Sequence, residues 1–259
     1  INILTDQESI KIINALNNIF KNIESENFNI ENDFEDIHSK IESLLIDELG
    51  NIGKKIHTGR SRNDQVLVAT QLFLKNEINE IKKLTIKLFN TLIDLAETNK
   101  NELLPGYTHL QVAMPSSFGL WFSSYAENLI DDILYLKTAY EINNQNPLGS
   151  GAGYGSSFKI DRNFTTKELD FGDLKYNVIS AQMSRGKVEK SVIIAINSIA
   201  STLSRLSSDI CFYMTQELNF ISFPEEITTG SSIMPHKKNP DVFELIRAKC
   251  NSLQSLIND

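Results

Sequence analysis

The sequence predicts an all-α protein built around a bundle of long helices. Three stretches, residues 64–98, 116–143 and 188–213, repeat apolar side chains at the intervals that gather them on one helical face. The 12 glycines and 6 prolines leave few breaks and gather between these stretches. No alternating apolar and polar pattern of comparable length predicts a strand.

The N-terminal region, residues 1–59, predicts a smaller helical unit that precedes the bundle. It contains two shorter amphipathic patterns, near residues 7–25 and 36–49. The remainder, residues 60–259, predicts an incomplete bundle domain whose third long helix extends toward Glu217. Helices of about 35 residues, near 50 Å at about 1.5 Å per residue, favour packing along their length as in helical bundles.

The composition is globular with an acidic balance. Of 259 residues 41% are hydrophobic, and 33 acidic against 25 basic residues give a formal net charge of -8. This charge disfavours a nucleic-acid partner, and no apolar run approaches the roughly 20 residues needed to cross a bilayer. Cys211 and Cys250 lie far apart without a zinc-binding pattern, which favours a cytoplasmic location.

The stretch TTGSSIMPHKKNPDVFE, residues 228–244, ends in a predicted helix start. The tripeptide NPD predicts Asn239 as the N-cap, followed by the first two helical residues. Lys237 and Lys238 stand just before it, and the start of a helix attracts negative charge. The segment therefore suits an anion, although an ordinary cationic loop is an open alternative.

The same stretch contains two adjacent serines that follow a glycine. A serine hydroxyl is a useful base or nucleophile only where cations or N–H donors stabilise its oxyanion. Ser231 and Ser232, with the backbone freedom of Gly230, predict a mobile loop able to close over a substrate. A simple turn is the alternative.

Two further turn-rich segments carry polar side chains between helices. PGYTHLQVAMP contains Thr108, His109 and Gln111, and histidine is the side chain best suited to proton transfer near neutral pH. HTGRSRND, residues 57–64, contains two arginines able to grip carboxylates bidentately ahead of another helix start. A surface histidine and a solvated cationic turn are the alternatives. The arginines are Arg60 and Arg62, and the candidate caps of the helix are Ser61 and Asn63.

These three segments together resemble the aspartase/fumarase superfamily. GSSIMPHKKNPD carries the superfamily's signature, whereas HTGRSRNDQV and PGYTHLQVAMP, in this order, resemble the argininosuccinate lyase family within it. The resemblance covers the chain from about residue 36 to its end. It implies an enzyme that cleaves argininosuccinate to arginine and fumarate by anti elimination, without metal or organic cofactor.

The resemblance also implies roles for individual residues. Ser231 matches the residue that exchanges the proton on carbon, and Lys237 and Asn239 match those that hold and neutralise the substrate carboxylate. His109 matches the acid or base that serves the departing guanidino nitrogen, and Glu244 matches the acid that orients this histidine. The implied substrate contacts are Ser61, Arg62, Asn63, Thr108, Gln111 and, for the guanidino end, Asp36.

Members of this family form homotetramers in which long helices of four subunits build a central bundle and three chains contribute to each active site. The resemblance therefore predicts a homotetramer with shared sites. Family members are longer than this chain, which begins at Ile1 rather than Met and ends inside the helical pattern SLQSLIND, so we expect it to be part of a longer protein. AQMSRGKVEK also differs from the acidic pattern of many relatives.

Two rival interpretations stay open at this stage. Adenylosuccinate lyase or fumarase keeps the reaction class and changes the substrate, and HTGRSRND argues against it. A catalytically silent structural relative is the other, and the joint presence of Ser231, His109, Lys237 and Glu244 argues against that.

Overall fold

The computed structural model describes residues 3–25 and 28–257, which fall into two compact units. One unit comprises Ile1–Thr70 and Gln145–Arg185, and the other comprises Gln71–Asn144 and Gly186–Asp259. The units group residues differently from the sequence-based domains, 1–59 and 60–259, which stay a prediction. Ile1 and the last two residues, cited for a longer parent protein, lie outside the described residues.

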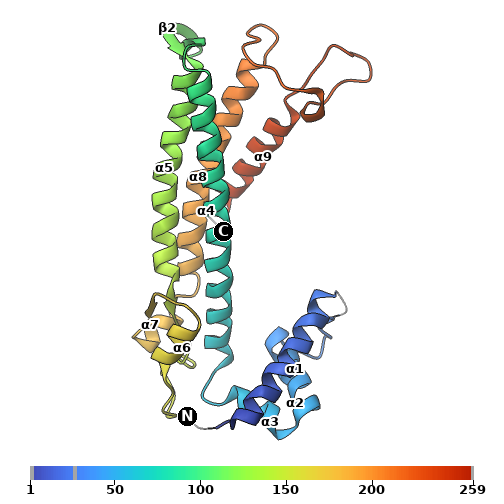
Figure 1. Cartoon of the computed structure of the whole chain (residues 1–259), viewed down its shortest axis with the longest axis vertical. Coiled ribbons are helices and arrows are strands. Elements are labelled where there is room, and N and C mark those ends of the chain that lie inside the picture. The colour runs from blue at the N-terminus through green and yellow to red at the C-terminus, as the bar shows by residue number, and fades with distance from the viewer. Residues whose placement is uncertain (1–2, 26–27, 258–259) are drawn as a thin grey trace. The chain divides into compact units, whose positions relative to one another are not determined.

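The second unit is the helical bundle that the apolar spacing predicted. α5 (Phe118–Asn143) packs against α8 (Lys187–Tyr213), and α8 packs against α9 (Asp241–Ser255). The part of α4 (Arg62–Thr98) that belongs to this unit runs beside α5 and α8 (Figure 1). The three long helices are confirmed to within two residues at each end, and so is the all-α fold class.

The predicted extension of α8 toward Glu217 is wrong. The helix ends at Tyr213, because the chain reverses after it and the N–H groups of Phe220 and Ile221 donate to the Tyr213 carbonyl. Asn219, with φ of 47°, supplies the left-handed residue of the reversal, a conformation that asparagine tolerates better than most residues.

Two apolar clusters hold the bundle together. The lower cluster brings together Ile78 of α4, Leu136 of α5 and Val192 of α8. The upper cluster, at the end of the bundle where α8 stops, is aromatic and includes Trp121, with its neighbours Tyr213 and Leu129. Full burial of each large apolar side chain stabilises the fold by about 1.5–3 kcal/mol, so every long helix depends on its neighbours.

Two carboxylates, one buried and one partly buried, add polar links between α5 and α8. Asp132, 3% exposed, accepts hydrogen bonds from Ser198 and Thr202 at 2.5 and 2.7 Å. Asp209 accepts from Trp121 Nε1 at 3.0 Å and from the Tyr125 hydroxyl at 2.5 Å. Burial and this bond to Asp209 raise the pKa of Tyr125. Since the buried Asp132 and the partly buried Asp209 are both hydrogen-bonded, their removal from water is tolerated, and these bonds define how the two helices align.

A β-hairpin at the upper end of the bundle was not predicted. β1 (Leu103–Thr108) pairs antiparallel with β2 (Gln111–Ser117), and Figure 1 shows the hairpin beyond the start of α5. His109 and Leu110 form the two-residue turn with φ of 54° and 59°, as in a type I′ turn. The usual turn residues, asparagine and glycine, are absent, so the sequence lacked the ordinary hairpin signal.

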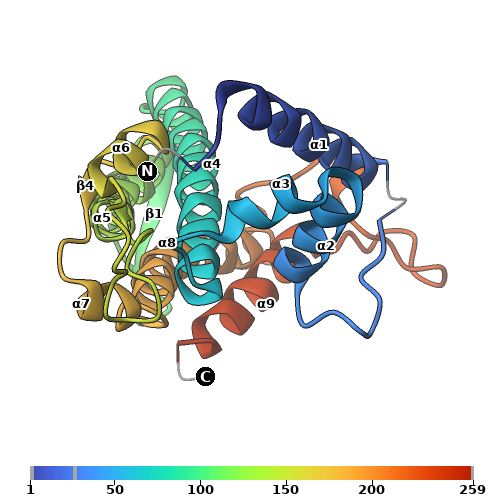
Figure 2. The same cartoon turned by 90° about the horizontal axis from the view of Figure 1, so that it is seen from below.

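The first unit is built from short elements. α1 (Asp6–Glu24) packs on α2 (Ile37–Leu49) and α3 (Asn51–Lys54), as Figure 2 shows, around buried Ala15, Ile19 and Leu45. The helices predicted near residues 7–25 and 36–49 are therefore confirmed. The remaining elements of this unit are η1 (Lys55–His57), β3 (Gln145–Asn146), α6 (Arg162–Glu168), β4 (Asp173–Leu174) and α7 (Val178–Gln182).

The Asp64 carboxylate ties the two segments of the first unit together. Its Oδ2 accepts from the N–H groups of Gly149 and Gly151 at 2.9 and 3.0 Å, and Oδ1 accepts from the Ser61 N–H at 2.9 Å. Asp64 has no exposed surface. Both glycines have positive φ, and a Cβ on Gly149 would lie 2.8 Å from Arg162, so only glycine fits there.

We expect Asp64→Ala to lower the free energy of unfolding by about 3 kcal/mol or more, because it leaves two buried N–H groups and one partly buried N–H group without an acceptor. Asp64→Asn should cost less, since one accepting oxygen remains. Urea denaturation measures both, with the exposed Asp47→Ala as the control. Equal stability of the Asp64 and Asp47 variants would contradict this role.

Asp36 caps α2 by accepting the Ser39 N–H at 2.7 Å. Partial burial acts to raise the pKa of Asp36, but hydrogen bonds from Ser39 and the charge of Arg62 hold that pKa below its ordinary value. A lowered pKa in the folded state means that the ionised carboxylate stabilises the fold above the unfolded pKa of about 3.9, and that this contribution is lost as the pH falls through the folded pKa.

We therefore expect Asp36→Ala to lower the free energy of unfolding by about 1 kcal/mol at neutral pH. Asp36→Asn keeps a capping oxygen and should cost less. The difference between wild type and Asp36→Asn, measured by denaturation from neutral pH to about pH 3, should shrink in acid. A difference independent of pH would show that the charge of Asp36 does not contribute.

Candidate functional site

The segment with the adjacent serines forms a closed loop between α8 and α9. It passes through η2 (Glu225–Ile227), and Thr229 and Asn239 then pair as an antiparallel bridge with N···O distances of 3.2 and 2.8 Å. Asn239 Nδ2 also donates to Thr229 Oγ1 at 3.4 Å. In Figure 1 the chain between α8 and α9 projects away from the helices. The bridge therefore forms the base of a loop that contains Ser231 and Lys237.

Ser231 is oriented by its own loop. Its Oγ accepts hydrogen bonds from the N–H groups of Ile233 and Met234, both at 3.3 Å. Donors aimed at a hydroxyl oxygen favour its negatively charged form, and this chemistry helps a serine to act as a base. Neighbouring Ser232 is exposed and, within the described part of the chain, makes no side-chain hydrogen bond.

The predicted cap at Asn239 is wrong. α9 begins at Asp241 with Pro240 in the capping position, and the Pro240 carbonyl accepts from the N–H groups of Phe243 and Glu244. Asn239 is not available as a cap because its backbone and amide pair with Thr229. It stands at the loop base, next to the helix start.

The two lysines of this loop differ. Lys238 Nζ lies 3.0 Å from Glu225 Oε1, so an ion pair already engages it. Lys237 is exposed and has no carboxylate within ion-pair distance among the described residues. Glu244 is exposed in the first turn of α9, where the helix dipole favours a carboxylate. Lys237 is thus the cation of this loop available to an outside anion.

His109 stands at the tip of the β-hairpin, with Thr108 and Gln111 as the flanking pair. All three are exposed. The two left-handed residues of the turn cost about 1–2 kcal/mol each, a strain that proteins often keep at functional sites. Among the described residues no side chain hydrogen-bonds the His109 imidazole, so its predicted contact with Glu244 is not made within one chain.

An aromatic contact places the hairpin and the start of the serine loop at the same end of the bundle. Tyr107 of β1 packs edge-on against Phe212 of α8, with 5.5 Å between ring centroids. It also contacts Phe220, at 6.4 Å, in the segment that leads to the loop. The structure therefore brings the hairpin that carries His109 and the segment that leads to the Ser231 loop to one end of the second unit.

The other predicted residues lie in the first unit, at the start of α4 and, for Asp36, at the start of α2. The Ser61 carbonyl accepts from the Gln65 N–H and Ser61 Oγ accepts from the Asn63 N–H, both at 3.2 Å, so Ser61 rather than Asn63 is the cap. Asn63 is exposed. Asp36, predicted to meet a substrate guanidino group, already caps α2 and lies 3.5 Å from Arg62 Nε.

Arg62 does not have the free fork expected for a bidentate grip. Its Nη1 donates to Gln65 at 3.0 Å, and its Nη2 donates to Ser39 at 3.3 Å and Glu42 at 3.2 Å. Glu42 and Ser39 were missed from the sequence. The available signal was the repeat of Asp36, Ser39 and Glu42 at intervals of three residues in DIHSKIE, which places them on one face of the predicted helix.

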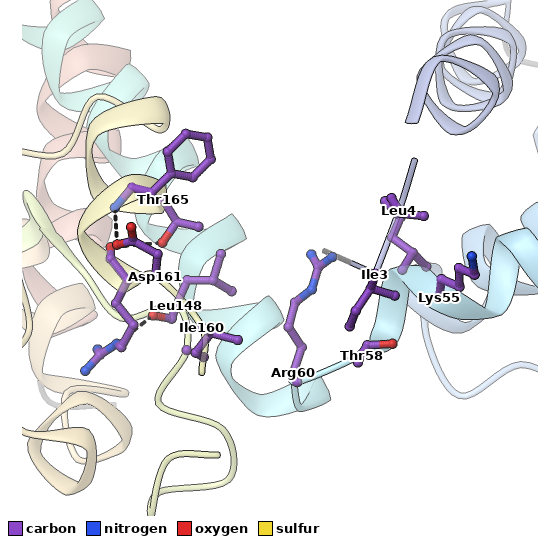
Figure 3. Close-up of a pocket in the computed structure, with 14 residues that line it drawn as sticks. Ile3, Leu4, Lys55, Thr58, Arg60, Leu148, Ile160, Asp161 and Thr165 are labelled. Atoms are coloured by element: carbon purple, nitrogen blue, oxygen red, sulfur yellow. Dashed lines mark hydrogen bonds between the residues drawn. The ribbon is translucent and has the colours of Figure 1, made fainter. Parts of the chain in front are cut away.

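Arg60 points into a separate cleft of about 350 Å³ in the first unit (Figure 3). Ile3, Leu4 and Lys55 line one side, and Ile160 and Asp161 line the other. None of the predicted substrate residues lines this cleft. Arg60 also lines a second, smaller hollow of about 120 Å³, which it shares with Arg62 and Glu42.

Two general findings concern cofactors and membranes. Within residues 3–25 and 28–257, no group of three or more His, Cys, Asp or Glu side chains is arranged to hold a metal ion. In the same part of the chain, none of the helices has the length and apolar character to cross a membrane.

Comparison with known proteins identifies the family. A family model described as Lyase matches residues 1–254. The chain is 54% identical over 256 residues to an argininosuccinate lyase of Bacteroides fragilis, covering 99% of this chain and 57% of that protein. It is 45% identical to an argininosuccinate lyase of Thermotoga neapolitana, covering 95% of this chain and 62% of the relative. The chain thus spans about three fifths of the length of these relatives.

Solved structures agree with this assignment. The fold matches an EDDS lyase variant with bound fumarate at a TM-score of 0.90 and 25% identity, over 98% of this chain and 50% of that one. A class II fumarase from Schistosoma mansoni shares the fold at a TM-score of 0.67 and 21% identity, over 80% of this chain and 48% of that one. The chain therefore belongs to the lyase family whose model covers residues 1–254.

Proposed function

We propose that the protein is an argininosuccinate lyase, which cleaves argininosuccinate to arginine and fumarate. The observation that carries this proposal is the Ser231 loop. Its hydroxyl oxygen receives two backbone N–H groups, Thr229 and Asn239 pair at its base, and Lys237 has no ion-pair partner in the part of the chain that the structure describes. The identity of 54% to an argininosuccinate lyase supports the choice of substrate. The fumarate bound to the EDDS lyase variant supports the product class.

In this proposal Ser231, as its oxyanion, takes the proton from the carbon beside a substrate carboxylate. The electrons of that C–H bond first spread into the carboxylate, and Lys237 and Asn239 stabilise the added negative charge. These electrons then form the C=C bond of fumarate as the C–N bond breaks. His109 donates a proton to the departing guanidino nitrogen, which completes arginine. Glu244 orients His109.

We assign the substrate contacts to two groups of residues. Thr108 and Gln111 flank His109 on the hairpin, and Ser61, Arg62 and Asn63 begin α4. We assign these five residues to substrate binding. Asp36 stays our candidate for the guanidino end, although its carboxylate is also engaged by Ser39 and Arg62.

We also propose a homotetramer whose active sites are shared between subunits. Large apolar side chains are exposed along the bundle, including Leu84, 67% exposed, on α4 and Leu134, 57% exposed, on α5. Apolar surface of this kind is typical of an interface. The His109 imidazole, without a partner among the described residues, also suits a site that another chain completes. A cytoplasmic location, predicted from the isolated cysteines, stays a prediction.

The catalytic roles are tested by substitution in the full-length protein. Ser231→Ala and His109→Asn should each lower turnover by about 10²–10⁴-fold, the usual contribution of an acid or base, with helicity unchanged. Ser232→Ala is the matched control and should retain activity. Fumarate release from argininosuccinate is the measurement, with adenylosuccinate and malate as competing substrates. Near-normal rates of the Ser231 variant, or turnover of only a competing substrate, would refute the assignment.

The assembly is tested by sedimentation velocity. We expect the wild-type protein to sediment as a tetramer, and Leu84→Glu and Leu134→Glu to shift it to smaller species, because a charge in an apolar interface is costly. Lys87→Glu, a charge change at an exposed position of α4, is the control. A monomeric wild type, or variants that remain tetrameric, would contradict the proposed interface.

A further inference from the structure

We propose that Glu42 is a positioning residue, which holds the HTGRSR turn, residues 57–62, in the shape that presents Ser61, Arg62 and Asn63 to the substrate. This inference rests on the proposed function. Glu42 touches no substrate in this proposal and acts through the turn.

One oxygen of Glu42 reaches both ends of the turn. Oε2 lies 3.2 Å from Nη2 of Arg62, at the end of the turn, and 3.2 Å from Nδ1 of His57, at its beginning. Between these ends the backbone has little regular structure, and Gly59 has φ of 72°. Within the turn, the Arg60 N–H donates to the His57 carbonyl at 3.2 Å. A single carboxylate from α2 adds a link between the two ends of this segment, which the backbone alone does not provide.

The geometry of α2 suits this task. Asp36, Ser39 and Glu42 follow one another at intervals of three residues, so they lie along one face of the helix. All three face the guanidinium of Arg62: Asp36 at Nε, and Ser39 and Glu42 at Nη2. Gln65 accepts from Nη1. The protein thus engages every nitrogen of Arg62 and leaves one hydrogen, on Nη1, for an outside acceptor.

This arrangement is more than a surface ion pair. The side chains of Arg62 and Glu42 are 25% and 27% exposed, so solvent screens them less than a pair at the surface. A guanidinium fixed by several acceptors loses little further freedom when a substrate binds. We therefore assign Glu42 a contribution to substrate affinity rather than to the rate of the chemical step.

The test compares Glu42→Gln with Glu48→Gln, the same change on an exposed position of α2. Glu42→Gln should raise KM for argininosuccinate about ten-fold, the effect of one weakened charged hydrogen bond, and leave kcat nearly unchanged. In an Arg62→Lys background the effect of Glu42→Gln should largely disappear, because both changes remove the same interaction. Glu42→Asp should recover part of the loss.

A second measurement is independent of activity. Hydrogen–deuterium exchange of peptides that cover residues 57–63 should be faster in Glu42→Gln than in Glu48→Gln, because the turn loses its clamp. Faster exchange with an unchanged KM would overturn the positioning role, and so would a full effect of Glu42→Gln in the Arg62→Lys background. If the wild-type protein does not cleave argininosuccinate, the proposed function is wrong. If hydrogen–deuterium exchange of residues 57–63 is the same in Glu42→Gln and Glu48→Gln, Glu42 does not hold the turn.

Discussion

A long helix is stable in water only when an apolar stripe along it is buried, and the rest of this structure depends on that constraint. The helices from Arg62, Phe118 and Lys187 run for 37, 26 and 27 residues, and two apolar clusters share their side chains. The bundle therefore fixes where each helix ends, and it holds the turns that connect the helices in place.

The chemistry lies in these turns because the helical faces are committed to packing. The hairpin with His109 and the segment that leads to the Ser231 loop both meet the aromatic cluster where α8 stops. Each keeps its reactive group away from the core: His109 at a strained turn, Ser231 in a loop closed by a backbone bridge. A rigid scaffold with reactive loops is a common arrangement in enzymes.

In the first unit, carboxylates take the place of a large core. Asp64 collects three N–H groups, and Asp36 and Glu42 engage Arg62. These interactions hold segments with few buried apolar side chains. Asp64 and Glu42 thus act as structural partners of Ser61 and Arg62, which were predicted as site residues. Periodicity identified the long helices, but the hairpin escaped because His-Leu is an unusual turn and its strands are half exposed.

The sequence by itself determined the helical fold class, the positions of the long helices and the motifs that carry Ser231, His109 and Arg62, because these depend on local spacing and residue type. Only the tertiary structure decided that Asn239 pairs with Thr229 instead of capping a helix, that Arg62 is held by α2, and that Asp64 binds the glycine-rich segment. Each of these is a choice among several possible hydrogen-bond partners. Such a choice depends on which distant groups folding brings near, and no local pattern records it.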